Sequence, residues 1–180
     1  VEERRRYSGL SLTWLAKKVE DYTWKGADHC LPVTDVLADH LRAAGVFDDK
    51  ITVIHNGVRQ PFIDEMLASP IDLEKENIVI GFTGFINPWH GMDKAIEAIA
   101  EHKELPLKLV CIGDGTILPE LKQQAADLGI ADKVEFKGLV TRDKVLDFVK
   151  EFDISLQPDV TAYASPLKMF EYMAVGSLII

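Results

Sequence analysis

A lysine and a glutamate three residues apart, Lys168 and Glu171, lie in the stretch of this sequence that is best suited to bind a charged ligand. Pro166 fits the first turn of a helix because it has no N–H that would need an intrahelical partner, and Ser165 precedes it as the predicted cap. Free N–H groups at a helix start, together with a lysine, favour phosphate, and a carboxylate one turn later can accept hydrogen bonds from sugar hydroxyls. The pattern suggests a site for a nucleoside diphosphate.

The spacing of apolar residues in the same stretch predicts a helix over 166–175 with two faces. Lys168 and Glu171 share one face, which would remain available for chemistry. The other face is expected to pack against a core, through Leu167, Phe170, Met173 and Ala174.

Composition limits the classes of function that need to be considered. The chain has 180 residues, and its 47% of hydrophobic residues is enough for a real core. A net charge of −9 argues against a general nucleic-acid surface, which needs a broad basic field. Two cysteines far apart in the sequence, Cys30 and Cys111, are expected to be reduced and buried. With no visible metal cluster, membrane span or signal peptide, we expect a soluble, cytoplasmic protein.

From residue 78 onward, apolar strands alternate with amphipathic helices. We predict strands at 78–82, 107–112, 134–136, 154–156 and from 178, and helices at 92–102, 117–128, 144–152 and 166–175. This alternation is typical of an α/β fold with a Rossmann-like parallel sheet and helices on both faces. Ligands of such folds bind at the carboxyl ends of the strands, which selects the loops at 83–91, 113–116, 138–141 and 157–165.

The first third of the chain is organised differently. A basic start leads into a helix that ends near residue 27; arginines close to Trp14 suggest weak contact with an anionic membrane, although nearby acids favour a solvated helix face. A strand at 29–33, a helix capped by Thr34 or Asp35 that stops at Gly45, and a strand at 50–55 are predicted next.

Residues 58–77, with their interrupted apolar spacing, are predicted to be a linker. The predicted division is therefore 1–57, 58–77 and 78–180. Because the sequence begins at Val1 and ends within an apolar run, we expect a fragment of a longer protein.

Each of the selected loops has features suited to a ligand. Gly84 would let the backbone approach a ligand closely, and His90 follows in the same loop. Gly113, Asp114 and Gly115 lead into a helix without the third glycine of a dinucleotide fingerprint, and Val140 follows Gly138. An ordinary strand-to-helix turn explains each loop equally well.

Taken in order, these segments resemble the retaining GT-B glycosyltransferases often called group 1, or family 4, in the subset with a Ser-Pro-Leu-Lys helix start. The resemblance runs from about residue 28 to residue 180 and rests on 54–58, 82–91, 111–115, 134–138 and 165–176. It implies two Rossmann-like domains facing across a cleft, with the donor held mainly by the second. The second domain would be incomplete here, and residues 1–57 would be a remnant of the first.

The resemblance also implies a role for each candidate residue. Glu171 would hold the ribose hydroxyls, and Lys168 would stabilise the charge of the leaving diphosphate without a metal. The remaining donor-binding residues would be Ser165, Pro166 and Leu167 by the diphosphate, Gly113, Asp114, Gly115 and Val140 at the base, and Gly84 and His90 near the phosphates. No nucleophile is identified. Three positions depart from many relatives: Tyr163 replaces a glutamate, Phe85 an arginine and His90 a lysine.

We therefore expect the donor-binding part of a hexosyltransferase of polysaccharide biosynthesis, which uses a UDP- or GDP-sugar and a glycan or lipid acceptor. Two alternatives remain, a nucleotide-sugar epimerase or hydrolase of the same fold and a non-catalytic binding module. The first alternative needs several acid and base groups in the cleft, and among the histidines only His90 is well placed. The chain alone is expected to be inactive without the rest of its N-terminal domain, and to self-associate through edges that this domain would cover.

Overall fold

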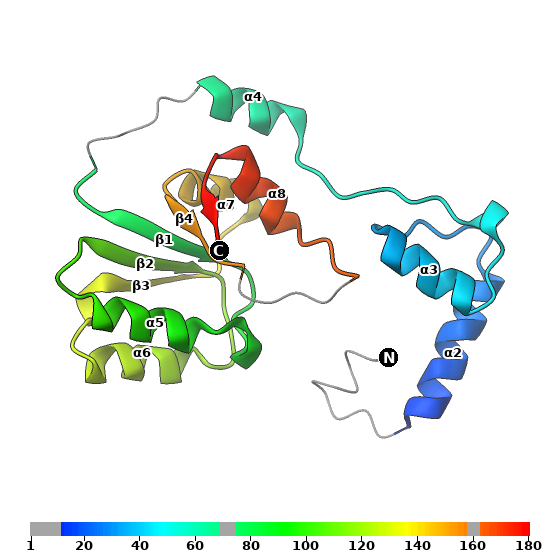
Figure 1. Ribbon diagram of the computed structural model, residues 1–180, viewed down its shortest axis with the longest axis horizontal. Coiled ribbons are helices and arrows are strands. Elements are labelled where there is room, and N and C mark those ends of the chain that lie inside the picture. The colour runs from blue at the N-terminus through cyan, green and yellow to red at the C-terminus, as the bar shows by residue number, and fades with distance from the viewer. Residues whose placement is uncertain (1–11, 69–74, 158–162) are drawn as a thin grey trace. The chain divides into compact units, whose positions relative to one another are not determined.

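The structure is a computed structural model that describes residues 12–68, 75–157 and 163–180 (Figure 1). The chain divides into two compact units. Of the described residues, those up to Asn56 and those from Tyr163 to Ser165 form the N-terminal unit, and all others form the sheet unit.

A parallel sheet of five strands is the centre of the sheet unit. The strands are β1 (Ile78–Thr83), β2 (Leu107–Ile112), β3 (Val134–Gly138), β4 (Ile154–Ser155) and β5 (Leu178–Ile179). They lie in the order β3-β2-β1-β4-β5, and every neighbouring pair is parallel. The strand order changes direction at β1, which is the kind of switch point where open α/β sheets bind their ligands.

Helices cover both faces of this sheet, as predicted (Figure 1). On one face lie α5 (Met92–Glu101) and α6 (Leu118–Asp127), whose apolar residues form a core with β1, β2 and β3. On the other face lie α7 (Arg142–Val149) and α8 (Leu167–Ala174). Gly81 of the central strand, β1, leaves room for the Phe152 ring in this second core. A Cβ added to Gly81 would lie 2.1 Å from that ring.

The N-terminal unit contains α2 (Thr13–Gly26) and α3 (Asp35–Ala43). Thr34 caps α3 as predicted, because its Oγ1 accepts a hydrogen bond of 3.2 Å from the Leu37 N–H. The unit also includes residues 163–165, since the Thr34 hydroxyl donates to the Tyr163 carbonyl at 3.0 Å.

The two strands predicted in this unit, 29–33 and 50–55, are wrong. Among the described residues of this unit only one parallel bridge forms, between Cys30 and Ile51. A short 3₁₀ helix, η1 (Asp48–Lys50), directly precedes Ile51. The ladder stops because the next bond would need an N–H from Pro32, which has none. The Pro32 carbonyl still accepts a bond of 2.9 Å from the Ile54 N–H.

The predicted linker 58–77 contains a helix, α4 (Gln60–Ala68). Two smaller 3₁₀ helices, η2 (Pro88–His90) and η3 (Ala131–Lys133), precede α5 and β3. No helix within the described residues is long and apolar enough to cross a membrane. The arginines at the start of the sequence lie outside the described residues.

Candidate functional site

Helix α8 packs through a different face from the one that its apolar residues predict. Tyr172 is fully buried in the second core, whereas Leu167 and Met173 are exposed. The Tyr172 hydroxyl accepts a hydrogen bond of 2.9 Å from the Thr83 N–H and lies 3.1 Å from the Thr83 Oγ1. Burial raises the pKa of Tyr172 to about 12, so the hydroxyl stays protonated. This contact fixes α8 at the carboxyl end of β1.

The start of α8 also differs from the prediction. Pro166 is the N-cap residue, with an extended ψ of 123°, and no side chain caps the helix. Ser165 therefore does not cap the helix, because the extended Pro166 moves the first helical residue to Leu167. The Ser165 carbonyl instead accepts a hydrogen bond of 2.7 Å from Asn56 Nδ2 within the N-terminal unit.

The loops that follow β1, β2 and β3 remain hydrogen-bonded to one another beyond the strands. The Gly84 N–H donates to the Ile112 carbonyl at 2.9 Å, and the Gly113 N–H donates to the Gly138 carbonyl at 2.8 Å. Gly113 has a φ of +128°, and a Cβ at this position would lie 2.0 Å from the Gly84 oxygen. Glycine is therefore required here for the close approach of two loops. We call the four residues that these bonds join, Gly84, Ile112, Gly113 and Gly138, the pocket floor.

A pocket of about 590 Å³ opens above the pocket floor. Of the residues predicted to bind a ligand, nine line it: Gly84, His90, Gly113, Asp114, Val140, Pro166, Leu167, Lys168 and Glu171. Gly115 and Ser165 do not line it. A Cβ on Gly115 would lie 2.0 Å from the Ile86 oxygen, so this glycine serves the packing of the loops.

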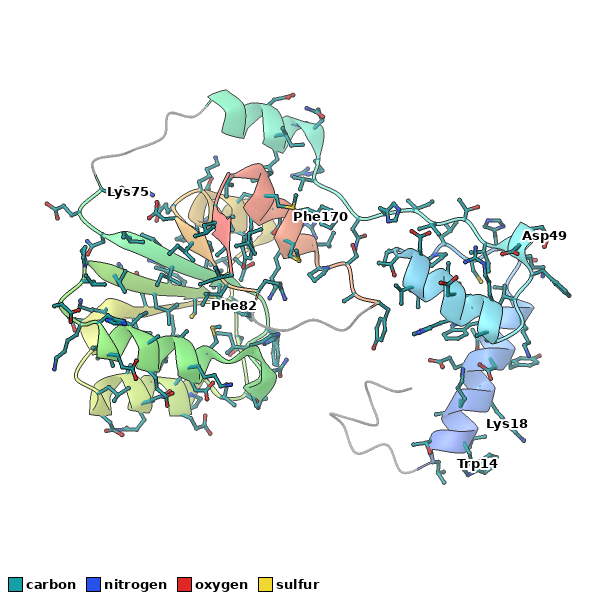
Figure 2. All side chains as sticks on the ribbon, in the orientation of Figure 1. Trp14, Lys18, Asp49, Lys75, Phe82 and Phe170 are labelled. Atoms are coloured by element: carbon teal, nitrogen blue, oxygen red, sulfur yellow. The ribbon has the colours of Figure 1, made fainter. Side chains whose placement is uncertain are left out.

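Lys168 carries a positive charge close to the pocket floor. Its Nζ lies 4.0 Å from the centroid of the Phe82 ring, and a Cβ on Gly84 would be 3.9 Å from the same nitrogen (Figure 2 labels Phe82). The ammonium has no hydrogen bond or ion pair to another residue in the described part of the chain. Burial lowers the pKa of Lys168 to about 8. An anion in the pocket would stabilise the protonated form.

His90 is held in a fixed orientation beside this lysine site. Its Nδ1 accepts a hydrogen bond of 3.0 Å from the Asn87 N–H, and its backbone N–H completes the capping box of η2 with Asn87. The imidazole ring lies 5.1 Å from the Phe82 ring. Lys168 and His90 therefore approach the same phenylalanine, which brings together two of the predicted residues.

Glu171 is half-buried and lines the pocket one turn after Lys168. Burial raises the pKa of its carboxyl, and the positive charge of Arg142 opposes this shift. Arg142 also lines the pocket and was not predicted from the sequence, whereas Phe85 and Leu139, which line it too, lie in the loops selected at 83–91 and 138–141. A basic residue directly after the β3 loop, at the start of a helix, is the signal that would have identified Arg142.

The family assignment rests on residues 77–180, which match the family model described as "Glycosyl transferases group 1". The chain belongs to the group 1 glycosyltransferases. The match covers more than half of the chain and includes all five strands of the sheet.

Two curated glycosyltransferases are similar in sequence. The 2-deoxystreptamine glucosyltransferase of Streptomyces kanamyceticus is 29% identical over 84 residues, which are 46% of this chain and 22% of the relative. The D-inositol 3-phosphate glycosyltransferase of Streptomyces scabiei is 29% identical over 126 residues, which are 61% of this chain and 28% of the relative. The matched regions are thus less than a third of each relative's length.

Solved structures of glycosyltransferases share the fold. The Anabaena protein HepE, in complex with UDP-glucose, superposes with a TM-score of 0.68 at 19% identity, over 96% of this chain and 49% of that one. A glycosyltransferase from Rickettsia africae has the same TM-score at 18% identity, over 88% of this chain and 46% of that one. These similarities establish a GT-B-like fold for this group 1 glycosyltransferase.

Proposed function

We propose that the sheet unit binds the nucleotide-sugar donor of a retaining glycosyltransferase, which moves a hexose from a UDP- or GDP-sugar to a glycan or lipid acceptor. The observation that carries the proposal is Lys168, whose ammonium lies over Phe82 in a pocket at the carboxyl ends of the strands. Within the described residues this ammonium has no anionic partner. A diphosphate supplies the missing charge.

The chemistry proposed for this site is stabilisation of the leaving group. When the bond between the sugar and the diphosphate breaks, negative charge develops on the diphosphate. In this proposal the Lys168 ammonium and the start of α8, which both line the pocket, stabilise that charge. In this proposal the described residues stabilise the charge without a metal. Glu171 accepts hydrogen bonds from the ribose hydroxyls, and Val140 lies beside the base.

The comparisons favour UDP over GDP in this proposal. The reason is that HepE was solved with UDP-glucose. We propose that the acceptor binds to residues outside the sheet unit. Because this chain covers about half of the solved relatives' chains, we propose that it binds donor without transferring sugar by itself.

Calorimetric titration of the chain with UDP and GDP tests the proposal. Lys168→Met keeps the aliphatic stem but removes the charge, and we expect it to weaken UDP binding by about tenfold or more, as for loss of a charge-assisted hydrogen bond. Glu171→Ala removes the proposed ribose contact and should weaken binding as well. Lys144→Met is the matched control, because Lys144 is exposed and does not line the pocket.

Three outcomes would contradict the proposal. The first is the absence of binding by either nucleotide at millimolar concentration. The second is UDP binding that neither Lys168→Met nor Glu171→Ala changes. The third is hydrolysis of a UDP-sugar by this chain without an acceptor, which would instead favour a hydrolase of the same fold.

A further inference from the structure

Phe85 is an exposed aromatic side chain of the pocket. It lies in the loop after β1, lines the pocket and has 55% of its surface exposed. The other exposed large apolar side chains on the described lining are Leu139 and Leu167, which carry no ring. Among the described residues of the lining, Phe85 is therefore the one that offers a phenyl face to a ligand.

The backbone on both sides of Phe85 is fixed. The N–H groups of Gly84 and Ile86 donate to carbonyls at the end of β2 and in the loop after it, at 2.9 and 2.7 Å. Ile86 is fully buried in the first core, and Gly115 lies so close that its Cβ would be 2.0 Å from the Ile86 oxygen. The exposure of Phe85 thus follows from tight packing of its neighbours. An exposed ring forgoes the stability that burial would give it, and contact with a ligand would recover part of that stability.

The order of the strands places Phe85 at one end of the pocket. A Cβ on the preceding residue, Gly84, would lie 3.9 Å from Lys168 Nζ, the proposed partner of the diphosphate. Val140, the proposed neighbour of the base, follows β3, which β2 separates from β1. Two strand spacings put these ends of the sheet about 10 Å apart. A donor with its base at the β3 end and its diphosphate at Lys168 therefore has its hexose on the Phe85 side.

We infer that Phe85 is a specificity-determining residue for the donor, whose phenyl face packs against the C–H groups of the hexose. The inference rests on the proposed function, because it concerns the sugar end of the same pocket. A hexose carries hydroxyls around its edge and C–H groups on its faces. The face of a phenyl ring is negative and attracts C–H groups, and a half-exposed ring leaves the hydroxyls in water. Such a contact favours the nucleotide-sugar over the free nucleotide.

The experiment measures the affinities of the chain for UDP-glucose and for UDP by calorimetry. Phe85→Ala removes the ring, and we expect UDP-glucose to bind about threefold to tenfold more weakly, the range for one contact with an aromatic face, while the affinity for UDP stays the same. Phe85→Tyr keeps the ring and should keep the wild-type ratio of the two affinities. Phe85→Leu keeps apolar bulk without a ring and should resemble Phe85→Ala.

Two control variants remove other exposed apolar side chains. Leu139→Ala shortens a lining residue in the loop after β3, at the proposed base end, and should change both affinities by the same factor. Phe47→Ala removes an exposed phenylalanine of the N-terminal unit that does not line the pocket, and should change neither affinity. The Tm of each variant reports whether its fold is intact.

Proton NMR of the bound donor provides a readout that a merely structural role would not move. Protons that lie over a phenyl face are shifted upfield by its ring current. We expect the hexose protons of UDP-glucose to shift upfield on binding to the wild-type chain and to Phe85→Tyr. The shift should be lost in Phe85→Leu, while the signals of the uracil protons should change alike in all three proteins.

Three outcomes would overturn the inference. In the first, Phe85→Ala weakens UDP and UDP-glucose equally, so that the ring contacts the nucleotide. In the second, Phe85→Ala changes neither affinity, so that the ring serves no bound donor. In the third, Phe85→Leu keeps the wild-type ratio and the upfield shift. In all three cases the loss of UDP affinity in Lys168→Met would still support the proposed function, whereas the absence of UDP binding by the wild-type chain contradicts both.

Discussion

Substitution of Tyr172 by phenylalanine removes one hydroxyl and leaves the aromatic ring in place. The buried Thr83 N–H, which donates to that hydroxyl at 2.9 Å, then has no acceptor. A buried donor without a partner costs about 1–3 kcal/mol of the free energy of unfolding. Such a loss is large against a total stability of about 5–15 kcal/mol for a typical domain.

Two measurements test this expectation. Thermal unfolding should show a lower Tm, by about 2–4 °C for each kcal/mol lost. Hydrogen exchange of the Thr83 amide, followed by NMR, should be faster in the variant, while the amides of α2 in the N-terminal unit should exchange as before. Tyr22→Phe is the control, because Tyr22 is 80% exposed and its substitution should change stability by about 0.5 kcal/mol or less.

The double variant with Thr83→Val isolates the side-chain part of the contact. Valine removes the Thr83 hydroxyl and keeps the backbone N–H, so the coupling between the two substitutions reports the 3.1 Å contact alone. The reasoning is refuted if Tyr172→Phe resembles Tyr22→Phe in Tm and the Thr83 amide exchanges at the wild-type rate. In that case the hydroxyl would not hold α8 at the end of β1.

Three further predictions follow from the same contacts. Gly113→Ala should reduce both stability and UDP affinity, because its Cβ would meet the Gly84 oxygen and its φ is +128°; denaturant unfolding compares it with Gly26→Ala, whose Cβ would meet nothing within 4 Å. Gly81→Ala should cost about 1–3 kcal/mol of unfolding free energy through overpacking against Phe152, and an unchanged urea midpoint would contradict the packing described for this core. Because the pKa of Lys168 is lowered to about 8 without an anion, UDP binding near pH 8 should take up protons and weaken as the pH rises further; calorimetry in buffers of different ionisation enthalpy measures the uptake, which Lys168→Met should abolish.

The sheet and the ligand-bearing end of the sheet unit could be predicted from the sequence. Apolar strands alternating with amphipathic helices determine a parallel sheet, and in a parallel sheet the loops after the strands lie at one edge. Lys168 and Glu171 were predicted to serve one site because helical spacing places them on adjacent turns of one helix. The structure brings both residues into one pocket.

Three features depended on partners that are distant in sequence. Tyr172 was not expected inside because its hydroxyl needs an acceptor or donor, and the Thr83 backbone that satisfies it lies 89 residues away. The Ser165 carbonyl similarly meets Asn56, 109 residues away. Arg142 was not predicted to line the site because a charged residue at an exposed helix start is usually solvated. The packing of α7 beside α8 brings it to the same pocket as Glu171.

The pocket floor has a consequence for how this site responds to mutation. Its bonds join main-chain atoms of Gly84, Ile112, Gly113 and Gly138, so no side-chain truncation can delete them. An alanine scan of the region would therefore test the side chains that line the pocket but not the main-chain hydrogen bonds of the pocket floor. Substitution of a glycine by a larger residue is the change that perturbs the pocket floor. In a saturation library read out by folding stability, substitutions of the lining side chains should be tolerated better than substitutions of Gly84, Gly113 and Gly138, which all have a positive φ.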